Sequence, residues 1–124
     1  MDKYFISESE DTPRIEFDPE NKLFEISGRS LPENAIGFYE SVLIWLDNYS
    51  KAPLEMTVMN FKLEYFNTSS AKQIAKILLL LEKMAEKGQR VIINWFYHKE
   101  DTDMYASGNR FSKLISLNFS FIEL

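Results

Sequence analysis

The residue types best suited to chemistry in this sequence form the run Asn67-Thr68-Ser69-Ser70. An apolar, strand-like stretch precedes this run, and residues at helical spacing follow it, so the run is expected at the start of a helix. The first turn of a helix leaves backbone N–H groups unpaired, and they carry partial positive charge. A phosphate on Thr68, Ser69 or Ser70 would therefore find hydrogen-bond donors close by.

Lys72 and Lys76 follow one turn apart in the same expected helix. A lysine this early in a helix opposes the helix dipole, so an acidic group nearby would be stabilising. The simpler interpretation of the run is that Thr68 or Ser69 is the N-cap of the helix, a common role for serine and threonine. The residues alone leave both interpretations open.

A second group of polar side chains is the acidic run that contains Glu100, Asp101 and Asp103. Carboxylate oxygens are the ligands that hard divalent cations prefer, but the run lacks the glycine and the distal glutamate of an EF-hand loop. An alternative is that Asp101 or Thr102 caps a short helix. Another is that the loop is a partner-binding surface, because acidic loops steer protein association.

His98 is the only histidine, and it precedes Asp101 and Asp103 by a few residues. These three residues suggest a small hydrolase that uses general acid–base catalysis. No nucleophile elbow supports that hypothesis, and the four glycines form neither a P-loop nor a dinucleotide fingerprint. The absence of cysteine removes thiolate catalysis, disulfides and cysteine zinc sites. His98 is therefore interpreted as a surface residue at a strand end, and no metal or cofactor is expected.

The composition is that of a small, acidic, globular protein. The chain has 124 residues, of which 45% are hydrophobic, with ten Phe, six Tyr and two Trp, enough for one domain over residues 1–124. A net charge of −5 argues against nucleic-acid binding, which needs a basic surface. There is no secretory signal pattern, and the longest apolar run, 77–81, is too short to cross a bilayer. A cytoplasmic protein without membrane contact is expected.

The hydrophobic pattern predicts an α/β domain with the element order βββ-α-β-α-β-(α)-β. Strands alternate with helices in the second half of the chain, which is typical of a mixed sheet with helices packed mainly on one face. Strands are expected at 4–6, 14–17, 23–26, 54–66, 91–97 and 115–121. The turn-rich residues 18–21 join the second and third strands, which predicts a hairpin.

Local signals predict where several elements begin, end or bend. Ser30 to Glu33 fits a capping box for a first helix that closes by Pro53, and Gly88 is a suitable end for the second helix. The apolar parity of the strand 54–66 changes near Asn60, which predicts a bulge or a strand covered on both faces. A polar loop or a short helix is expected from 98 to about 114.

The segment Leu63–Lys72 resembles the signature of SiaC-type regulatory phosphoproteins, and the similarity covers nearly the whole chain. The entry to the first helix, Ser30 to Asn34, agrees with the same family, as do Trp95-Phe96-Tyr97 and the acidic run followed by Gly108. That family is similar to the anti-sigma-factor antagonists, which are STAS-like switch proteins. In those proteins a serine or threonine at a strand-to-helix junction is phosphorylated.

The resemblance implies that Thr68 is the phosphoacceptor, with Asn67, Ser69, Ser70 and Lys72 around it. It also implies a partner switch, in which a protein kinase and a PP2C-type phosphatase act on the chain. The unphosphorylated form would bind and activate a diguanylate cyclase, the enzyme of bacterial cyclic-di-GMP signalling. The function implied is that of an adaptor without enzymatic activity. The alternative is a constitutive interaction module that has no phosphorylation switch.

Overall fold

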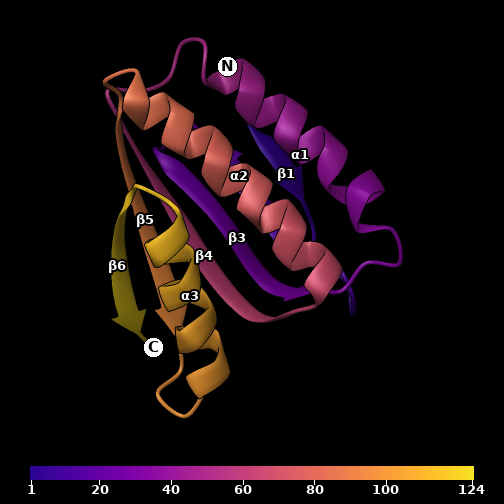
Figure 1. The fold of residues 1–124 in the computed structure, drawn as a ribbon. Coiled ribbons are helices and arrows are strands. Elements are labelled where there is room, and N and C mark those ends of the chain that lie inside the picture. Colours follow the sequence, from indigo (N-terminus) through magenta and orange to yellow (C-terminus); the bar gives the residue numbers. More distant parts are fainter.

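A computed structural model describes residues 1–124, with six strands and three helices in the predicted order (Figure 1). The segment from 98 to 114, for which the pattern allowed a loop or a short helix, contains a helix of 13 residues. The elements are β1 (Tyr4–Ile6), β2 (Arg14–Asp18), β3 (Leu23–Ser30), α1 (Ala35–Tyr49), β4 (Met56–Phe66), α2 (Thr68–Glu86), β5 (Arg90–Tyr97), α3 (Thr102–Leu114) and β6 (Asn118–Glu123).

The six strands lie in the sheet in the same order as in the sequence. β1, β2 and β3 pair antiparallel, and the predicted β2–β3 hairpin is confirmed. β3, β4, β5 and β6 pair parallel through the crossovers that contain the helices. Crossovers of one hand that always step in the same direction keep the helices on one face of the sheet. Figure 1 shows α1, α2 and α3 in front of the sheet, which confirms the predicted mixed, one-sided architecture.

The core lies between this helix layer and the sheet. Along β4 the buried residues are Thr57, Met59, Phe61 and Leu63, so one parity faces the helices from Thr57 to Leu63. The predicted change of phase near Asn60 is therefore wrong. Val58, of the other parity, is half-buried on the face that has no helices. The irregularity in the β3–β4 pairing lies further along, because Gly28 pairs with Leu63 whereas Arg29 pairs with Tyr65.

The first helix begins later than the capping-box pattern predicts. Its N-cap is Asn34, whose side-chain oxygen accepts a hydrogen bond from the N–H of Gly37 at 3.1 Å. Ser30 is not a cap, because its backbone still pairs with Phe66 of β4 and its side chain is completely buried. The second helix, α2, ends shortly before Gly88, which has a φ of +95°. The prediction that this glycine follows the end of the helix is confirmed.

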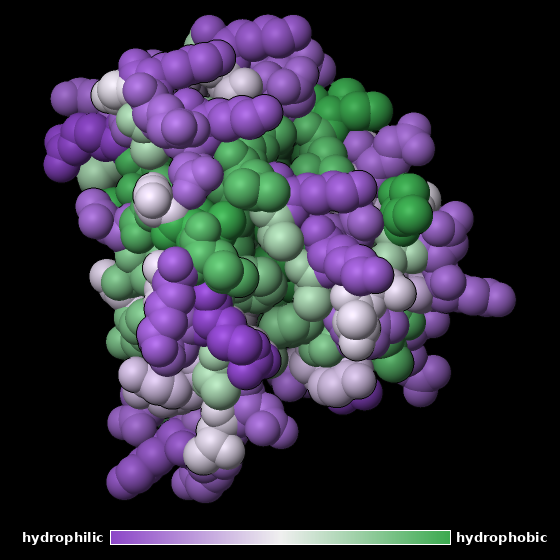
Figure 2. Space-filling view, viewed as in Figure 1, coloured by the Kyte–Doolittle hydropathy of each residue, from purple (hydrophilic) through white to green (hydrophobic).

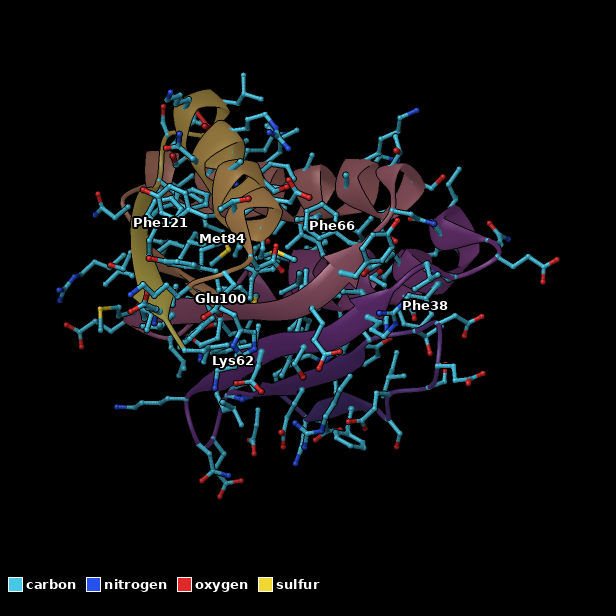
Figure 3. The ribbon with its side chains drawn as sticks, turned by 90° about the horizontal axis from the view of Figure 1, so that it is seen from below. Phe38, Lys62, Phe66, Met84, Glu100 and Phe121 are labelled. Atoms are coloured by element: carbon cyan, nitrogen blue, oxygen red, sulfur yellow. The ribbon has the colours of Figure 1, made fainter.

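The sheet face opposite the helices carries the ion pairs of the molecule. Glu16 binds the ammonium of Lys3 at 2.7 Å and the guanidinium of Arg14 at 2.8 Å, and Lys62 lies 3.3 Å from Glu25. Figure 3 shows Lys62 on this side, whereas Phe66 and Met84 point into the space under the helices. The hydrogen bond from Lys3 is the main cause that lowers the pKa of Glu16. None of the helices is both long and apolar enough to cross a membrane.

Candidate functional site

Thr68 is the first residue of α2, and it directly follows the residue that caps this helix. The cap is Asn67, whose side-chain oxygen accepts a hydrogen bond from the N–H of Ser70 at 2.9 Å. The prediction that Thr68 or Ser69 is the N-cap is therefore wrong. Because Asn67 makes the capping bond, the hydroxyl groups of Thr68 and Ser69 are not used for capping, and both residues are exposed. Their own backbone N–H groups bond to no other group of the chain, so two donors point out at the positive end of the helix dipole.

Ser70 differs from its two neighbours because it is completely buried. Ser30, at the end of β3, donates a hydrogen bond to the Ser70 hydroxyl at 2.8 Å, and the Tyr39 hydroxyl lies 2.6 Å from Ser30. Since the single proton of Ser30 goes to Ser70, Tyr39 is the donor to Ser30. Burial raises the pKa of Tyr39 to about 12, so this proton stays in place at neutral pH. Of the three hydroxyl residues named from the sequence, only Thr68 and Ser69 are accessible.

The surroundings of Thr68 are free of negative charge on its own helix. The first turn of α2 has no acidic residue, and Lys72 is exposed one turn further along without an ion-pair partner. Ser69 and Lys72 line a shallow groove of about 260 Å³, in which the start of α2 faces Glu33 and Asn34 at the start of α1. The junction thus combines a helix N-terminus, an exposed lysine and exposed hydroxyls.

The acidic loop lies on the other side of the junction. Asp101 is the N-cap of α3, and its side chain accepts a hydrogen bond from the N–H of Met104 at 3.0 Å, which confirms the helix-capping interpretation. Asp101 and Asp103 line a groove with Glu64, at the end of β4. Glu100 is exposed next to them. No three acidic or histidine side chains lie close enough together to hold a metal ion.

His98 is exposed after the end of β5, and its backbone carbonyl accepts a hydrogen bond from the N–H of Asp101 at 2.9 Å. It does not line the groove that contains Asp101 and Asp103. The hydrolase hypothesis needs one cleft that holds all three side chains, and the fold does not form it.

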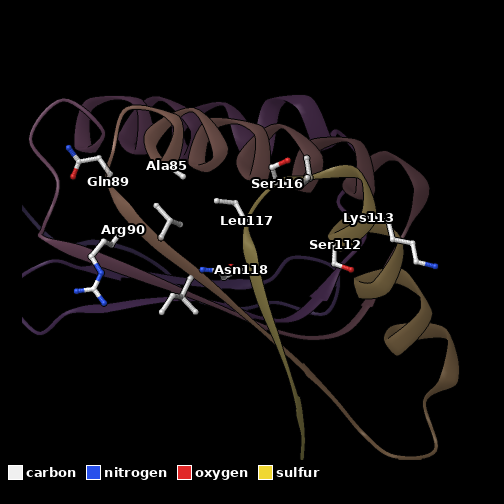
Figure 4. Close-up of a pocket in the computed structure, with 11 residues that line it drawn as sticks. Ala85, Gln89, Arg90, Ser112, Lys113, Ser116, Leu117 and Asn118 are labelled. Carbon is white, nitrogen blue, oxygen red and sulfur yellow. The ribbon is translucent and has the colours of Figure 1, made fainter.

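The largest cavity, of about 620 Å³ (Figure 4), lies beside the end of α2, whereas Thr68 is at the start of this helix. It is bounded by the end of α2, the start of β5, the end of α3 and the start of β6. Arg90 and Lys113 are the only charged side chains that line it. No carboxylate or histidine lines this cavity, and none of the candidate site residues from the sequence lies in it.

The buried chain of hydroxyls under α2 was not predicted from the sequence. Ser30 and Ser70 are 40 residues apart in the chain. From the sequence, Ser30 was interpreted as a helix cap and Ser70 as a neighbour of the phosphoacceptor. Tyr39 looked like an ordinary core residue at helical spacing. Only the parallel pairing of β3 with β4 brings these side chains together, and no spacing rule within one element reports it.

The one-sided mixed sheet with three helices, and the exposed hydroxyl residues at the N-terminus of α2, define a small α/β domain with a candidate modification site. The chain belongs to the SiaC family: the model of this family, described as "SiaC family regulatory phosphoprotein", matches residues 6–124.

Relatives and solved structures agree with this assignment. An uncharacterized protein of Pseudomonas aeruginosa (strain UCBPP-PA14) is 28% identical over 123 residues, which cover 97% of this chain and 95% of the relative. The crystal structure of apo-SiaC from Pseudomonas aeruginosa matches with a TM-score of 0.91 and 26% identity, over 98% of this chain and 99% of that one. A chain in the crystal structure of the diguanylate cyclase SiaD in complex with its activator SiaC, also from Pseudomonas aeruginosa, matches with the same TM-score, identity and coverage.

Proposed function

We propose that this chain is a cytoplasmic adaptor without enzymatic activity, and that it binds and activates a diguanylate cyclase while Thr68 is unphosphorylated. The family description as a regulatory phosphoprotein supports this function, as does the similarity to SiaC, which is described as the activator of the cyclase SiaD. A kinase that phosphorylates Thr68 and a PP2C-type phosphatase that reverses the reaction complete the switch. The observation that carries the proposal is the exposed hydroxyl of Thr68 at the first position of α2.

The local geometry favours Thr68 as the phosphoacceptor. Ser70 is buried and hydrogen-bonded, so a kinase cannot reach it without unfolding the first turn of α2. Ser69 is exposed, but it lies in the groove against the start of α1, whereas Thr68 does not line that groove. Asn67 caps the helix through Ser70, which leaves the N–H groups next to Thr68 free to bind phosphate oxygens.

Phosphorylation acts here by changing a docking surface. A phosphate adds about −1.5 to −2 charges at neutral pH. Lys72, one turn along the helix, attracts this negative charge. Asp101 and Asp103, on the other side of the junction between β4 and α2, carry charge of the same sign as the phosphate. A loss of about 3 kcal/mol in contact energy lowers partner affinity more than a hundredfold, so no rearrangement of the fold is required.

The phosphoacceptor is tested by mass spectrometry after incubation of the purified protein with its kinase and ATP. We expect one phosphate on Thr68, none on Thr68→Ala, and full modification of the matched variant Ser69→Ala, which removes the neighbouring exposed hydroxyl. Full modification of Thr68→Ala would refute the assignment.

The activator role is tested separately, by measuring cyclic-di-GMP synthesis by each diguanylate cyclase of the source organism with and without the unphosphorylated protein. We expect one of these cyclases to be stimulated. If none responds, the chain is not a cyclase activator. In pull-downs with the responsive cyclase, Thr68→Ala should bind and Thr68→Asp should bind more weakly, whereas equal binding would identify a constitutive interaction module.

A further inference from the structure

The strand β6 forms one edge of the sheet, with a neighbouring strand on one side only (Figure 1). Its pairing with β5 covers the whole strand. The N–H of Leu124 donates to the carbonyl of Tyr97 at 2.8 Å, so Leu124 directs its backbone groups toward β5. Because successive residues of a strand alternate in this direction, Phe119, Phe121 and Glu123 direct their N–H and C=O groups away from the sheet.

These free backbone groups select the kind of structure that binds to β6. A row of N–H and C=O groups at the spacing of a strand is satisfied by another extended segment, as in β-augmentation. The hydrophobic surface of the helix face gathers elsewhere, over α2 and toward α3, with hydrophilic side chains around it (Figure 2). The recognition element at this edge is thus the backbone, and its partner is a strand.

The opposite edge of the sheet is protected against such pairing, whereas β6 is not. β1 has only three residues, and the cationic groups of Lys3 and Arg14 lie over the ring of Phe5, at 5.6 and 5.0 Å from its centre. A short strand and charged side chains are devices that keep an edge from pairing. β6 has six residues without lysine, arginine or proline, and its pairing with β5 contains no bulge. Its one charged residue, Glu123, is the last of the strand.

The surface beside this edge is poor in charge, although 27% of the residues of the chain are charged and its net charge is −5. Residues 118–122 carry no charge. On α3, the ring of Tyr105 lies 5.3 Å from that of Phe121, so Tyr105 marks the side of the helix toward β6. Asn109 and Ser112 follow at steps of four and three residues and share this side. A second copy of this acidic chain can therefore approach the edge without strong repulsion.

We propose that two copies of this chain associate through β6, as antiparallel neighbours related by a two-fold axis at Ser120. In this register Phe119 of one copy lies opposite Phe121 of the second copy, and their outward N–H and C=O groups exchange hydrogen bonds. Ser120 lies opposite Ser120 of the second copy, on the face without helices. One sheet then runs through both copies, and all the helices stay on one face.

The same register brings aromatic rings together. Phe119 and Phe121 stack within one copy, with ring centres 6.2 Å apart, and Tyr105 packs beside them. Figure 3 shows Phe121 on the helix side of the sheet. The two-fold axis places the same rings of the second copy next to these, and aromatic cross-strand pairs stabilise antiparallel pairing.

Opposite charges also meet across the two-fold axis. Glu123 lies on the same side of β6 as Phe121, because side chains two residues apart in a strand share a face. Antiparallel pairing places it beside the start of β6 in the second copy, where Lys113 lines a cavity together with Leu117 and Asn118. Neither Glu123 nor Lys113 is in an ion pair within the chain. Each dimer thus gains this contact at both ends of the paired strands, which is the charge complementarity that favours a second copy.

Sedimentation of the purified protein at increasing concentration measures the association, and hydrogen exchange locates it. We expect a change from monomer to dimer, with the amides of Phe119 and Phe121 protected only in the dimer. The amides of Ser120 and Ile122 point toward β5, so their protection should not depend on concentration. Protein that stays monomeric up to about 1 mM would overturn the proposal. A dimer in which the Phe119 and Phe121 amides stay unprotected would place the interface elsewhere and reject the β6 edge.

A single introduced cysteine tests the two-fold axis, because the chain has no cysteine of its own. Ser120→Cys should form a disulfide-linked dimer under mild oxidation. Residues that face each other at a non-hydrogen-bonded position have Cα atoms about 4.5 Å apart, within the range that a disulfide spans. Ser27→Cys is the matched control, on the same face of the sheet but in β3, and it should stay monomeric. Equal cross-linking of the two variants would contradict the axis.

Exchange of the two charges tests the register. Lys113→Glu and Glu123→Lys should each weaken dimerisation about tenfold, because each replaces an attraction by a repulsion. The double variant restores opposite charges and should dimerise like wild type. Lys51→Glu, a change at an exposed lysine beyond the end of α1, should have no effect. A double variant that dimerises no better than the single variants would contradict the register.

A strand of another protein is the competing occupant of this edge. Ser120→Lys separates the two cases, because it places like charges opposite each other in the dimer. If the wild-type protein is monomeric and Ser120→Lys fails to stimulate the responsive cyclase, the edge binds a strand of that partner, and the second copy is rejected. The proposed function does not depend on this result, since stimulation by the wild-type protein tests it separately.

Discussion

Ser30 and Ser70 are joined by a buried hydrogen bond of 2.8 Å between their hydroxyl groups, although 40 residues separate them in the chain. Tyr39 extends this contact to α1, through its hydroxyl at 2.6 Å from Ser30. A backbone hydrogen bond links the same segments, because the N–H of Asn67 donates to the carbonyl of Ser30 at 3.0 Å. The end of β3, the second turn of α1 and the first turn of α2, which contains Thr68, are thus held together.

Removing the Tyr39 hydroxyl tests whether this buried chain stabilises the fold. Tyr39→Phe leaves Ser30 without its donor in a dry environment, and we expect the free energy of unfolding to fall by about 1–2 kcal/mol. Tyr4→Phe is the matched control, because the Tyr4 hydroxyl makes an equally short bond of 2.6 Å to Ser41 at the surface. Urea unfolding at neutral pH measures both, and equal losses would contradict a special role for the buried chain.

The cap of α2 is tested by Asn67→Ala. The variant removes the acceptor for the N–H of Ser70, so the free energy of unfolding should fall by about 1 kcal/mol. Hydrogen exchange should quicken most in the first turn of α2. Asn48→Ala replaces an exposed asparagine of α1 whose side chain makes no hydrogen bond, and it should leave stability nearly unchanged. A similar loss in both variants would mean that Asn67 does not act as a cap.

Gly108 sets the distance between α3 and β5. A Cβ atom at this position would overlap the indole ring of Trp95, whose Nε1–H donates to the carbonyl of Met104 at 3.0 Å. Overpacking of this kind costs about 1–3 kcal/mol, more than the gain of up to about 1 kcal/mol from placing alanine in a helix. Gly108→Ala should therefore lower the thermal midpoint of unfolding. An unchanged or higher midpoint would show that α3 shifts without cost.

The acid sensitivity of the fold should depend in part on Asp18. The hydrogen bond from the side-chain amide of Asn21, at 2.7 Å, is the main cause that lowers the pKa of Asp18 below its usual range. The folded state therefore prefers the ionised carboxylate. Its contribution to stability is complete above the pKa of an unfolded aspartate, about 4, and it is lost as the pH falls further through the lowered value.

Unfolding curves of Asp18→Ala and wild type at a series of pH values measure this contribution. The difference in stability should be largest near neutral pH and should shrink at acidic pH. Glu55→Ala, a change at an exposed carboxylate in a loop, serves as the control and should show no such dependence. A difference that stays constant down to low pH would contradict the assignment to ionised Asp18.

The element order and the position of Thr68 were predictable because each depends on local sequence. Alternating apolar residues, helical spacing and the polar run 67–70 are signals within one or two elements. The details that failed depend on distant pairing. Ser30 has the right type for a cap, but its pairing with β4 extends β3 through this position. The apolar residues of both parities in β4 gave no indication of which face the helices cover.

The groove between α2 and α3 could not be predicted from the sequence for a similar reason. Phe66 and Leu114 are far apart along the chain, and they line one groove only because α2 and α3 lie on the same face of the sheet. The position of Thr68 at a helix start was therefore predictable from local sequence, whereas the groove between α2 and α3 was not.

The central claim is tested most directly with protein that carries phosphothreonine only at position 68, made by incorporating the modified amino acid during synthesis. Stimulation of the responsive cyclase by this protein is compared with that of unphosphorylated protein and of protein with phosphoserine at position 69. Phosphorylation of Thr68 should raise the concentration needed for half-maximal stimulation on the order of a hundredfold, equivalent to about 3 kcal/mol, and phosphorylation of Ser69 should have a smaller effect. Equal stimulation by the Thr68-phosphorylated and unphosphorylated proteins would contradict the account.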